Sequence, residues 1–210
     1  MSRAAAIATR PHLRRDAAAN RQHLIDAAWQ VFADRGLDAS VEEIARVAGV
    51  GVGTLYRRFS TKDALVAALV QDVLDAMLAF AEDAAEQPDG GGLERYLEAA
   101  SAYQAEHSGC LPRLWNTDVD NPPIHRLRTT VGGLLEDAKR HGRVRADLTS
   151  TDLTVIMWSI RGVIETTRAV APEAWRRHLG IVLAGMRPAE QPLAHRPLSR
   201  PQVDKIIAGD

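Results

Sequence analysis

Cysteine is nearly absent from this sequence: Cys110 stands alone among 210 residues, which excludes a disulfide framework. Uninterrupted apolar runs of the roughly 18 residues that a membrane helix needs are also missing, as is the apolar core of a secretory signal. We therefore expect a cytoplasmic protein that makes no contact with a membrane. A mitochondrial transit peptide is the alternative for the Arg-bearing, Ala-rich start, and Asp16 argues against it.

Neither sign of charge dominates the whole chain, whose formal net charge is -1 at pH 7. The distribution is uneven, because residues 1–62 carry ten Arg and Lys against six Asp and Glu. A basic N-terminal part is compatible with a polyanionic partner, although a solvated surface accounts for it equally well. With 46% hydrophobic and 25% charged residues, the composition is that of a soluble globular chain of one or two domains.

The periodicity of apolar residues is helical throughout, so we predict an all-α fold. Apolar side chains recur at helical spacing from Leu24 to Phe32, and Gly36 is placed to end a helix over about residues 20–35. Ser40 and Glu43 have the spacing of a capping box, in which each residue's side chain binds the backbone of the other. This spacing predicts a short second helix.

Three closely spaced glycines, Gly49, Gly51 and Gly53, raise the question of a phosphate-binding loop. A dinucleotide fingerprint needs a preceding strand and a third glycine where Thr54 stands, and a P-loop needs a Gly-Lys-Ser/Thr triplet that the sequence lacks. The glycines instead fit a tight turn, with Gly49 at positive φ and Gly51 at the cap of a third helix from about Val52.

The third helix divides into two faces. Its inward positions are Val52, Leu55 and Phe59; its outward positions are Gly53, Thr54, Arg57 and Arg58, with Tyr56 at the edge. Two arginines alone are more often a solvated face. Two short helices joined by a tight turn, the second with polar and basic side chains outward, match the helix-turn-helix that lays a recognition helix in the major groove of DNA.

Residues 24–69, LIDAAWQVFADRGLDASVEEIARVAGVGVGTLYRRFSTKDALVAAL, resemble the DNA-binding domain of the TetR family of bacterial transcriptional regulators. More loosely, GRVRADLTSTDL and EAWRRHLGIVLAGMRP are similar to parts of the eighth and ninth helices in one branch of that family. The resemblance implies a repressor that a small molecule releases from a pseudo-palindromic operator in double-stranded DNA. The alternative is a small-molecule binding protein or enzyme without DNA binding, which a DNA-retention experiment would distinguish.

The resemblance also implies roles for single residues. Ser40, Tyr56 and Lys62 contact phosphates, and Arg57 reads a guanine edge. The groove-facing set is Val52, Gly53, Thr54 and Arg57, while Arg58 contacts backbone or base. Gly51 departs from the family, which usually has Ser or Thr there, so the hydroxyl contact to phosphate at that position is absent.

The rest of the chain also reads as helices, about nine in all. The further predicted helices run from Ser60 or Thr61 to about Ala85, over Leu93–His107, Leu111–Asn116 and Pro122 to about Arg140, from a cap at Thr149, Ser150 or Thr151, and over Pro172–Met186. Prolines at 188, 192, 197 and 201 predict an extended or disordered tail. The expected organisation is a flexible basic arm (1–19), a helix-turn-helix domain (20–65), a helical ligand-binding and dimerisation domain (66–187) and a Pro-rich tail (188–210).

The second domain is expected to hold an effector and a partner subunit. The family implies a small-molecule cavity, whose candidate residues are Met77, Tyr103, His107, Arg113, Trp115 and Trp158; ordinary core packing is the alternative for each. Arg161 is a further candidate to orient an anionic ligand. The last two predicted helices carry more apolar positions than one internal face uses, which predicts a homodimer through Ile156, Ile160, Ile164, Trp175, Leu179 and Leu183.

No catalytic residue, cofactor or metal site is predicted. His107 and Cys110 lie three residues apart, but no third ligand is spaced nearby, and a lone cysteine is most often a small core residue. No Ser, His and Asp set includes a nucleophile elbow.

Overall fold

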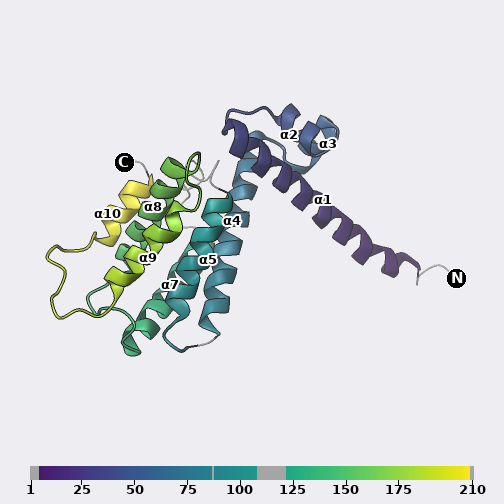
Figure 1. Cartoon of the computed structure of the whole chain (residues 1–210). Coiled ribbons are helices and arrows are strands. Elements are labelled where there is room, and N and C mark those ends of the chain that lie inside the picture. Colours follow the sequence, from purple (N-terminus) through teal and green to yellow (C-terminus); the bar gives the residue numbers. More distant parts are fainter. Residues whose placement is uncertain (1–4, 87, 108–121, 209–210) are drawn as a thin grey trace. The chain divides into compact units, whose positions relative to one another are not determined.

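The structure of the protein, a computed structural model, describes residues 5–86, 88–107 and 122–208. These residues form nine helices and no strand (Figure 1), which confirms the predicted all-α fold. The helices are α1 (Ala5–Arg35), α2 (Val41–Val47), α3 (Val52–Arg58), α4 (Lys62–Ala85), α5 (Gly92–Glu106), α7 (Pro122–Arg140), α8 (Ser150–Thr167), α9 (Ala174–Met186) and α10 (Arg200–Ala208). The chain divides into two compact units, Met1–Leu69 and Val70–Asp210. The helix predicted over 111–116 lies outside the described residues.

α1 begins at Ala5, about fifteen residues before the predicted start, so most of the segment expected to be a flexible arm is helical. The prediction followed the apolar stripe from Leu24 to Phe32, and such a stripe marks only the part of a helix that packs against a core. Alanine, which is frequent upstream of that stripe, is the strongest helix former and favours a helix there without an apolar stripe.

α10 corrects the prediction of an extended tail. Ser199 caps this helix, because its backbone N–H and its hydroxyl both donate to Gln202 Oε1, at 2.8 and 2.9 Å. Pro201 lies in the first turn, where the missing N–H has no helical partner to lose. Val203 is fully buried and anchors the helix. The prolines therefore precede or open the helix and do not prevent it.

The first unit packs α1, α2 and α3 around a common core. The side chain of His23 on α1 lies 2.9 Å from the carbonyl of Ala48 at the end of α2. The buried residues of the unit include Leu24, Ile25, Ala28, Phe32, Ile44, Leu55, Phe59, Leu65 and Leu69.

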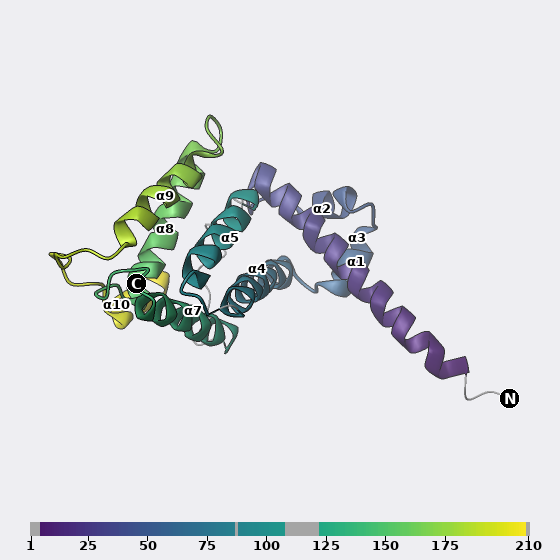
Figure 2. The same cartoon turned by 60° about the horizontal axis from the view of Figure 1, so that its bottom comes forward.

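In the second unit α5 packs against α7, α8 and α9, and α8 runs along α9 (Figure 2). Thr149 and Asp152 form a complete capping box at the start of α8, so the cap is the first of the three predicted alternatives. α9 begins at Ala174, two residues after the predicted Pro172. The core of this unit includes Leu93, Leu97, Leu134, Leu135, Leu153, Ile160, Trp175 and Leu179.

α4 is, within the described part of the chain, the one helix long and apolar enough to span a membrane by length and composition. Asp72 and Asp75 interrupt this stretch, so the sequence contains no unbroken apolar run of that length. Core helices of soluble proteins share this composition, and Leu69, Leu74 and Met77 are buried against the protein itself. Packing in the core therefore accounts for the apolar character of α4.

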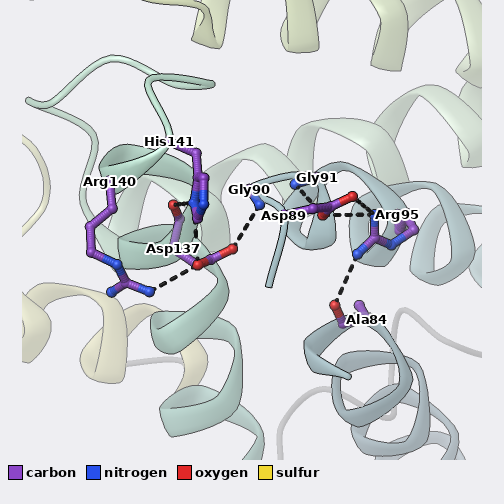
Figure 3. Close-up of polar contacts among 8 residues, drawn as sticks. All are labelled: Ala84, Asp89, Gly90, Gly91, Arg95, Asp137, Arg140 and His141. Carbon is purple, nitrogen blue, oxygen red and sulfur yellow. Dashed lines mark hydrogen bonds and ion pairs between the residues drawn. The ribbon is translucent and has the colours of Figure 1, made fainter. Parts of the chain in front are cut away.

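Two carboxylates hold the loop between α4 and α5 (Figure 3). Asp137 on α7 is 7% exposed and accepts a hydrogen bond from Gly90 N at 2.9 Å. Asp89 accepts from Gly91 N at 2.8 Å and pairs with Arg95 at 3.1 Å, and these contacts lower the pKa of Asp89. The loop thereby joins the end of α4 to the body of the second unit.

Candidate nucleic-acid interface and effector cavity

Ser40 caps α2, as its position in the sequence predicts. Its hydroxyl oxygen accepts a hydrogen bond from Glu43 N at 3.3 Å. The reciprocal half of the predicted capping box is replaced, because the Glu43 carboxylate pairs with Arg35 at 2.9 Å and Arg46 at 3.5 Å. A hydroxyl that accepts a cap bond keeps its own proton, so Ser40 retains a donor that suits a phosphate oxygen.

The turn between α2 and α3 uses its first two glycines as predicted. Gly49 has a φ of 64°, in the left-handed region that glycine adopts without strain. Gly51 is the N-cap of α3 with extended backbone, and its carbonyl accepts from Thr54 N at 2.8 Å. The turn is therefore compact and presents α3 directly after α2.

α3 has one buried and one exposed face. Leu55 and Phe59 are buried and Val52 is half-buried, so Val52 is less available for a groove than the other predicted contacts. The exposed residues are Gly53, Thr54, Tyr56, Arg57 and Arg58.

The exposed face of α3 is basic, because the helix contains two arginines and no acidic residue. Arg57 Nη2 donates to Thr54 Oγ1 at 2.9 Å, which fixes the guanidinium along the helix surface. Lys62 begins α4, where its ammonium lies 5.9 Å from the centre of the Phe32 ring. Ser40 before α2, the exposed residues of α3 and Lys62 at the start of α4 all belong to the first compact unit.

A cavity of about 190 Å³ lies in the second unit between α4, α5, α7, α8 and α10. Met77 and Trp158 line it, as predicted for an effector site. Its other lining residues are Leu74, Tyr96, Leu97, Gln104, Ile124, Leu127, Arg128, Val131, Ser150, Leu153, Thr154, Met157, Arg161, Arg200 and Ile207. Burial raises the pKa of the Tyr96 hydroxyl well above its usual range, so this side chain is neutral.

Two predicted cavity residues, Tyr103 and His107, do not belong to the lining that the described residues form. Tyr103 and His107 stack on each other with ring centres 4.0 Å apart, and Phe80 meets the edge of Tyr103 at 5.8 Å. These contacts account for both residues as packing at the end of α5. Arg113 and Trp115 lie outside the described residues.

The polar groups of the cavity come mainly from residues that sequence reasoning passed over. Gln104 is 2% exposed, and its amide nitrogen has no hydrogen-bond partner among the described residues. A buried donor without a partner costs about 1–3 kcal/mol. Arg200 and Ile207 were missed because α10 was not foreseen, whereas the heptad spacing Gln104 shares with Leu97 would have placed it on the inner face of α5.

Arginines stand at three places in the cavity wall. Arg161 Nε lies 3.3 Å from Glu165 Oε1 one turn further along α8. Asp204 accepts from Arg200 at 2.8 Å and lies 3.5 Å from Arg128. The hydrogen bond from Arg200, with the charges of both arginines, lowers the pKa of Asp204, which is therefore ionised at neutral pH.

The predicted dimer residues are mostly buried inside the chain itself. Ile160, Ile164, Trp175 and Leu179 are each less than 5% exposed and belong to the core between α8 and its neighbours. Ile156 and Leu183 are half-buried. The apolar stripes on α8 and α9 were predicted correctly, but this chain covers most of them.

The outer side of the same two helices is made of small and apolar residues. Its exposed positions include Val155, Ser159, Gly162 and Thr166 on α8, and Gly180, Ile181, Ala184 and Gly185 on α9, while the exposed Arg176 and Arg177 lie near the start of α9. Ile181 is 60% exposed. We call the first eight of these residues the outer α8–α9 face.

A capped short helix, a glycine turn and an exposed basic third helix define a helix-turn-helix DNA-binding protein. Residues 24–69 match the bacterial regulatory proteins of the tetR family, and residues 87–188 match the C-terminal domain of SbtR-like transcriptional regulators. The chain belongs to the TetR family of DNA-binding transcriptional regulators, whose members are not enzymes.

Solved structures extend the likeness over most of the chain. A TetR transcription regulatory protein from Mycobacterium vanbaalenii is 31% identical, with a TM-score of 0.58 over 83% of this chain and 99% of that one. The TetR transcriptional regulator SCO0520 from Streptomyces coelicolor is 29% identical, with a TM-score of 0.61 over 80% of this chain and 99% of its own.

Curated relatives match the DNA-binding part. An HTH-type transcriptional regulator of Staphylococcus aureus is 37% identical over 67 residues, which is 31% of this chain. The chain spans 36% of the length of that relative. This likeness therefore concerns the DNA-binding part of the chain and gives no information on the effector.

Proposed function

We propose that the protein is a homodimeric repressor that binds a pseudo-palindromic operator in the cytoplasm and leaves it when a small molecule occupies the cavity. The observation that carries the proposal is the exposed face of α3, which carries the hydroxyls of Thr54 and Tyr56 and two arginines on a helix without an acidic residue. The cavity of the second unit supplies the effector site.

DNA recognition is divided between two kinds of contact. Arg57 reads a base, since a guanidinium fits the O6 and N7 acceptors of guanine. Gly53 and Thr54 approach the groove beside it, while Val52 contributes at the edge of the helix. Ser40, Tyr56 and Lys62 bind phosphates, which set the register of the helix without reading sequence. Arg58 adds a contact to backbone or base.

Dimerisation uses the outer α8–α9 face. Glycine, alanine and serine let helices approach closely, and two copies of this face would form a four-helix bundle about a two-fold axis. Two recognition helices related by that axis match two half-sites of an operator.

The effector would release the operator through α4, the helix that contributes residues to both units. Leu74 and Met77 on α4 line the cavity, and Lys62 begins the same helix in the DNA-binding unit. A ligand that favours a different position of α4 lowers operator affinity, and by linkage DNA lowers ligand affinity by the same factor.

Selection of bound sequences from random DNA, followed by titration in increasing salt, tests the proposal. We expect one pseudo-palindromic sequence, with affinity falling by orders of magnitude when salt rises several-fold, because several phosphates are neutralised on binding. Absence of any selected sequence, or an affinity that does not change with salt, would contradict DNA recognition by α3.

A further inference from the structure

The cavity of the second unit has an unsatisfied hydrogen-bond donor in an apolar setting. Gln104 is 2% exposed, and its Nε2 has no partner among the described residues. Apolar side chains make up most of the lining to which Gln104 belongs, among them Leu97, Leu153 and Met157. A donor in such a place is satisfied by water or by an oxygen of a ligand.

Charge in the lining is of one sign. Arg128, Arg161 and Arg200 belong to the described wall, and no aspartate or glutamate does. The carboxylates that pair with the arginines, Glu165 and Asp204, stand outside the lining. Each pair thus presents its cationic partner to the cavity, which favours an anion and disfavours a cation even though the arginines are paired.

α10 completes this basic part of the wall. Its Val203 is fully buried, which docks the helix on the second unit, and Ile207 adds apolar surface to the cavity. Asp204 joins Arg200 of α10 to Arg128 of α7. Helices α7, α8 and α10 therefore each contribute one guanidinium.

We infer that the effector is an amphipathic carboxylate, with an apolar tail among the leucine, isoleucine and methionine side chains and an anionic head at the arginines. The inference rests on the proposed function, which makes this cavity the effector site. A guanidinium offers paired N–H donors that match the two oxygens of a carboxylate. Gln104 donates its free N–H to an oxygen of the same ligand.

Matched probes test the ligand class by calorimetry with the full chain. Hexanoate, octanoate, decanoate and benzoate are each compared with the primary amide and the amine of the same tail. The amide keeps the shape and the carbonyl acceptor and removes the charge, whereas the amine reverses the charge. We expect at least one acid to bind at least tenfold more tightly than its amide, and its amine not to bind.

Variants connect the preference to named residues. Arg161→Gln should reduce the ratio of acid to amide affinity severalfold, while Arg161→Lys should keep most of it. Gln104→Leu should weaken binding of acid and amide alike, and because it removes a buried unpaired donor it should not lower the unfolding temperature of the free protein. Arg126→Gln is the control, since Arg126 lies on the exposed side of α7 and outside the lining.

Three outcomes would overturn the inference: amides or amines that bind as tightly as acids, acids of which none binds up to its solubility limit, or an acid preference unchanged in Arg161→Gln. Operator binding, measured by fluorescence anisotropy on the same preparation, separates this failure from that of the proposed function. Sequence-specific DNA binding with no acid preference rejects the ligand class alone. Loss of sequence-specific DNA binding rejects the repressor, whatever the acids do.

Discussion

Ser159 on α8 and His178 on α9 meet through a hydrogen bond of 3.0 Å between Ser159 Oγ and His178 Nε2. This bond ties together the two helices whose outer sides form the outer α8–α9 face. The inner sides of the same helices hold Ile160 and Trp175, which are buried in the chain. Within the described part of the chain, this helix pair thus has one face that other helices cover and one face that they leave exposed.

A charge on the open face should separate subunits without unfolding them. We expect Ile181→Glu to give monomers in sedimentation and to lose operator affinity, because a single half-site offers few contacts. Ile160→Glu is the contrast, since a charge at a fully buried position should cost several kcal/mol and unfold the protein. If the Ile181→Glu protein remains dimeric, the dimer interface does not lie on the outer α8–α9 face.

Arg57 and Lys62 should have separable effects on DNA binding. Arg57→Ala should cost about 1–3 kcal/mol on the selected operator and relax the choice of base at one position in each half-site. Lys62→Ala should weaken binding to all sequences alike and lower the salt slope by roughly one. Repeated selection with each variant measures both effects. If Lys62→Ala changes the selected sequence and Arg57→Ala does not, the two roles are exchanged.

A side chain should impair DNA binding but not folding when it is added at Gly53, and should impair folding stability when it is added at Gly90. A Cβ at Gly53 meets nothing within 4 Å, so Gly53→Leu should fold and dimerise normally but fail to bind the operator because the groove floor is close. A Cβ at Gly90 would lie 2.5 Å from His141 Cβ, and the φ of Gly90 is +78°. Gly90→Ala should therefore lower the unfolding temperature. Thermal unfolding and DNA titration of both variants distinguish the two effects; normal operator binding by Gly53→Leu would remove Gly53 from the interface.

Asp147 should make part of the stability of the folded protein depend on pH in the acidic range. Hydrogen bonds from Arg145 and from Leu193 N hold the pKa of Asp147 at about 2, below its usual 3.8. A carboxylate whose pKa is lowered by folding stabilises the protein above its unfolded pKa, and this contribution disappears as the pH falls through the folded pKa. The difference in unfolding temperature between the unchanged protein and Asp147→Asn should therefore be full at pH 5 and vanish near pH 2. A difference that stays constant over this range would contradict the assignment.

The DNA-binding unit could be predicted closely because its signals are local. A cap at Ser40, a positive φ at Gly49 and a buried Leu55 each follow from a few neighbouring residues, and the structure contains all three. The capping-box spacing also predicts the reciprocal bond from Glu43, and its replacement could not be foreseen, since Arg35 on another helix competes for that carboxylate. Sequence patterns over a few residues do not show whether a side chain from another helix will compete for the same group.

The second unit was harder to predict because burial depends on partners distant in sequence. Periodicity places Ile160 and Trp175 on apolar stripes, but it does not say whether this chain or another covers them. The cavity wall was equally hard to predict, since Arg200 belongs to α10 and Pro201 was expected to exclude a helix there. Tyr103 and His107 have side chains that would suit a pocket, yet their rings stack on each other.

The hydrogen bond from Arg57 to Thr54 bears on the entropy of recognition. A free arginine side chain has many rotamers and loses about 2 kcal/mol of conformational freedom when it is fixed. Thr54 restricts those rotamers in the free protein, so a base contact by Arg57 would order a side chain that is already partly ordered. In the proposed complex, the affinity of α3 for DNA would then depend partly on a threonine that need touch no base.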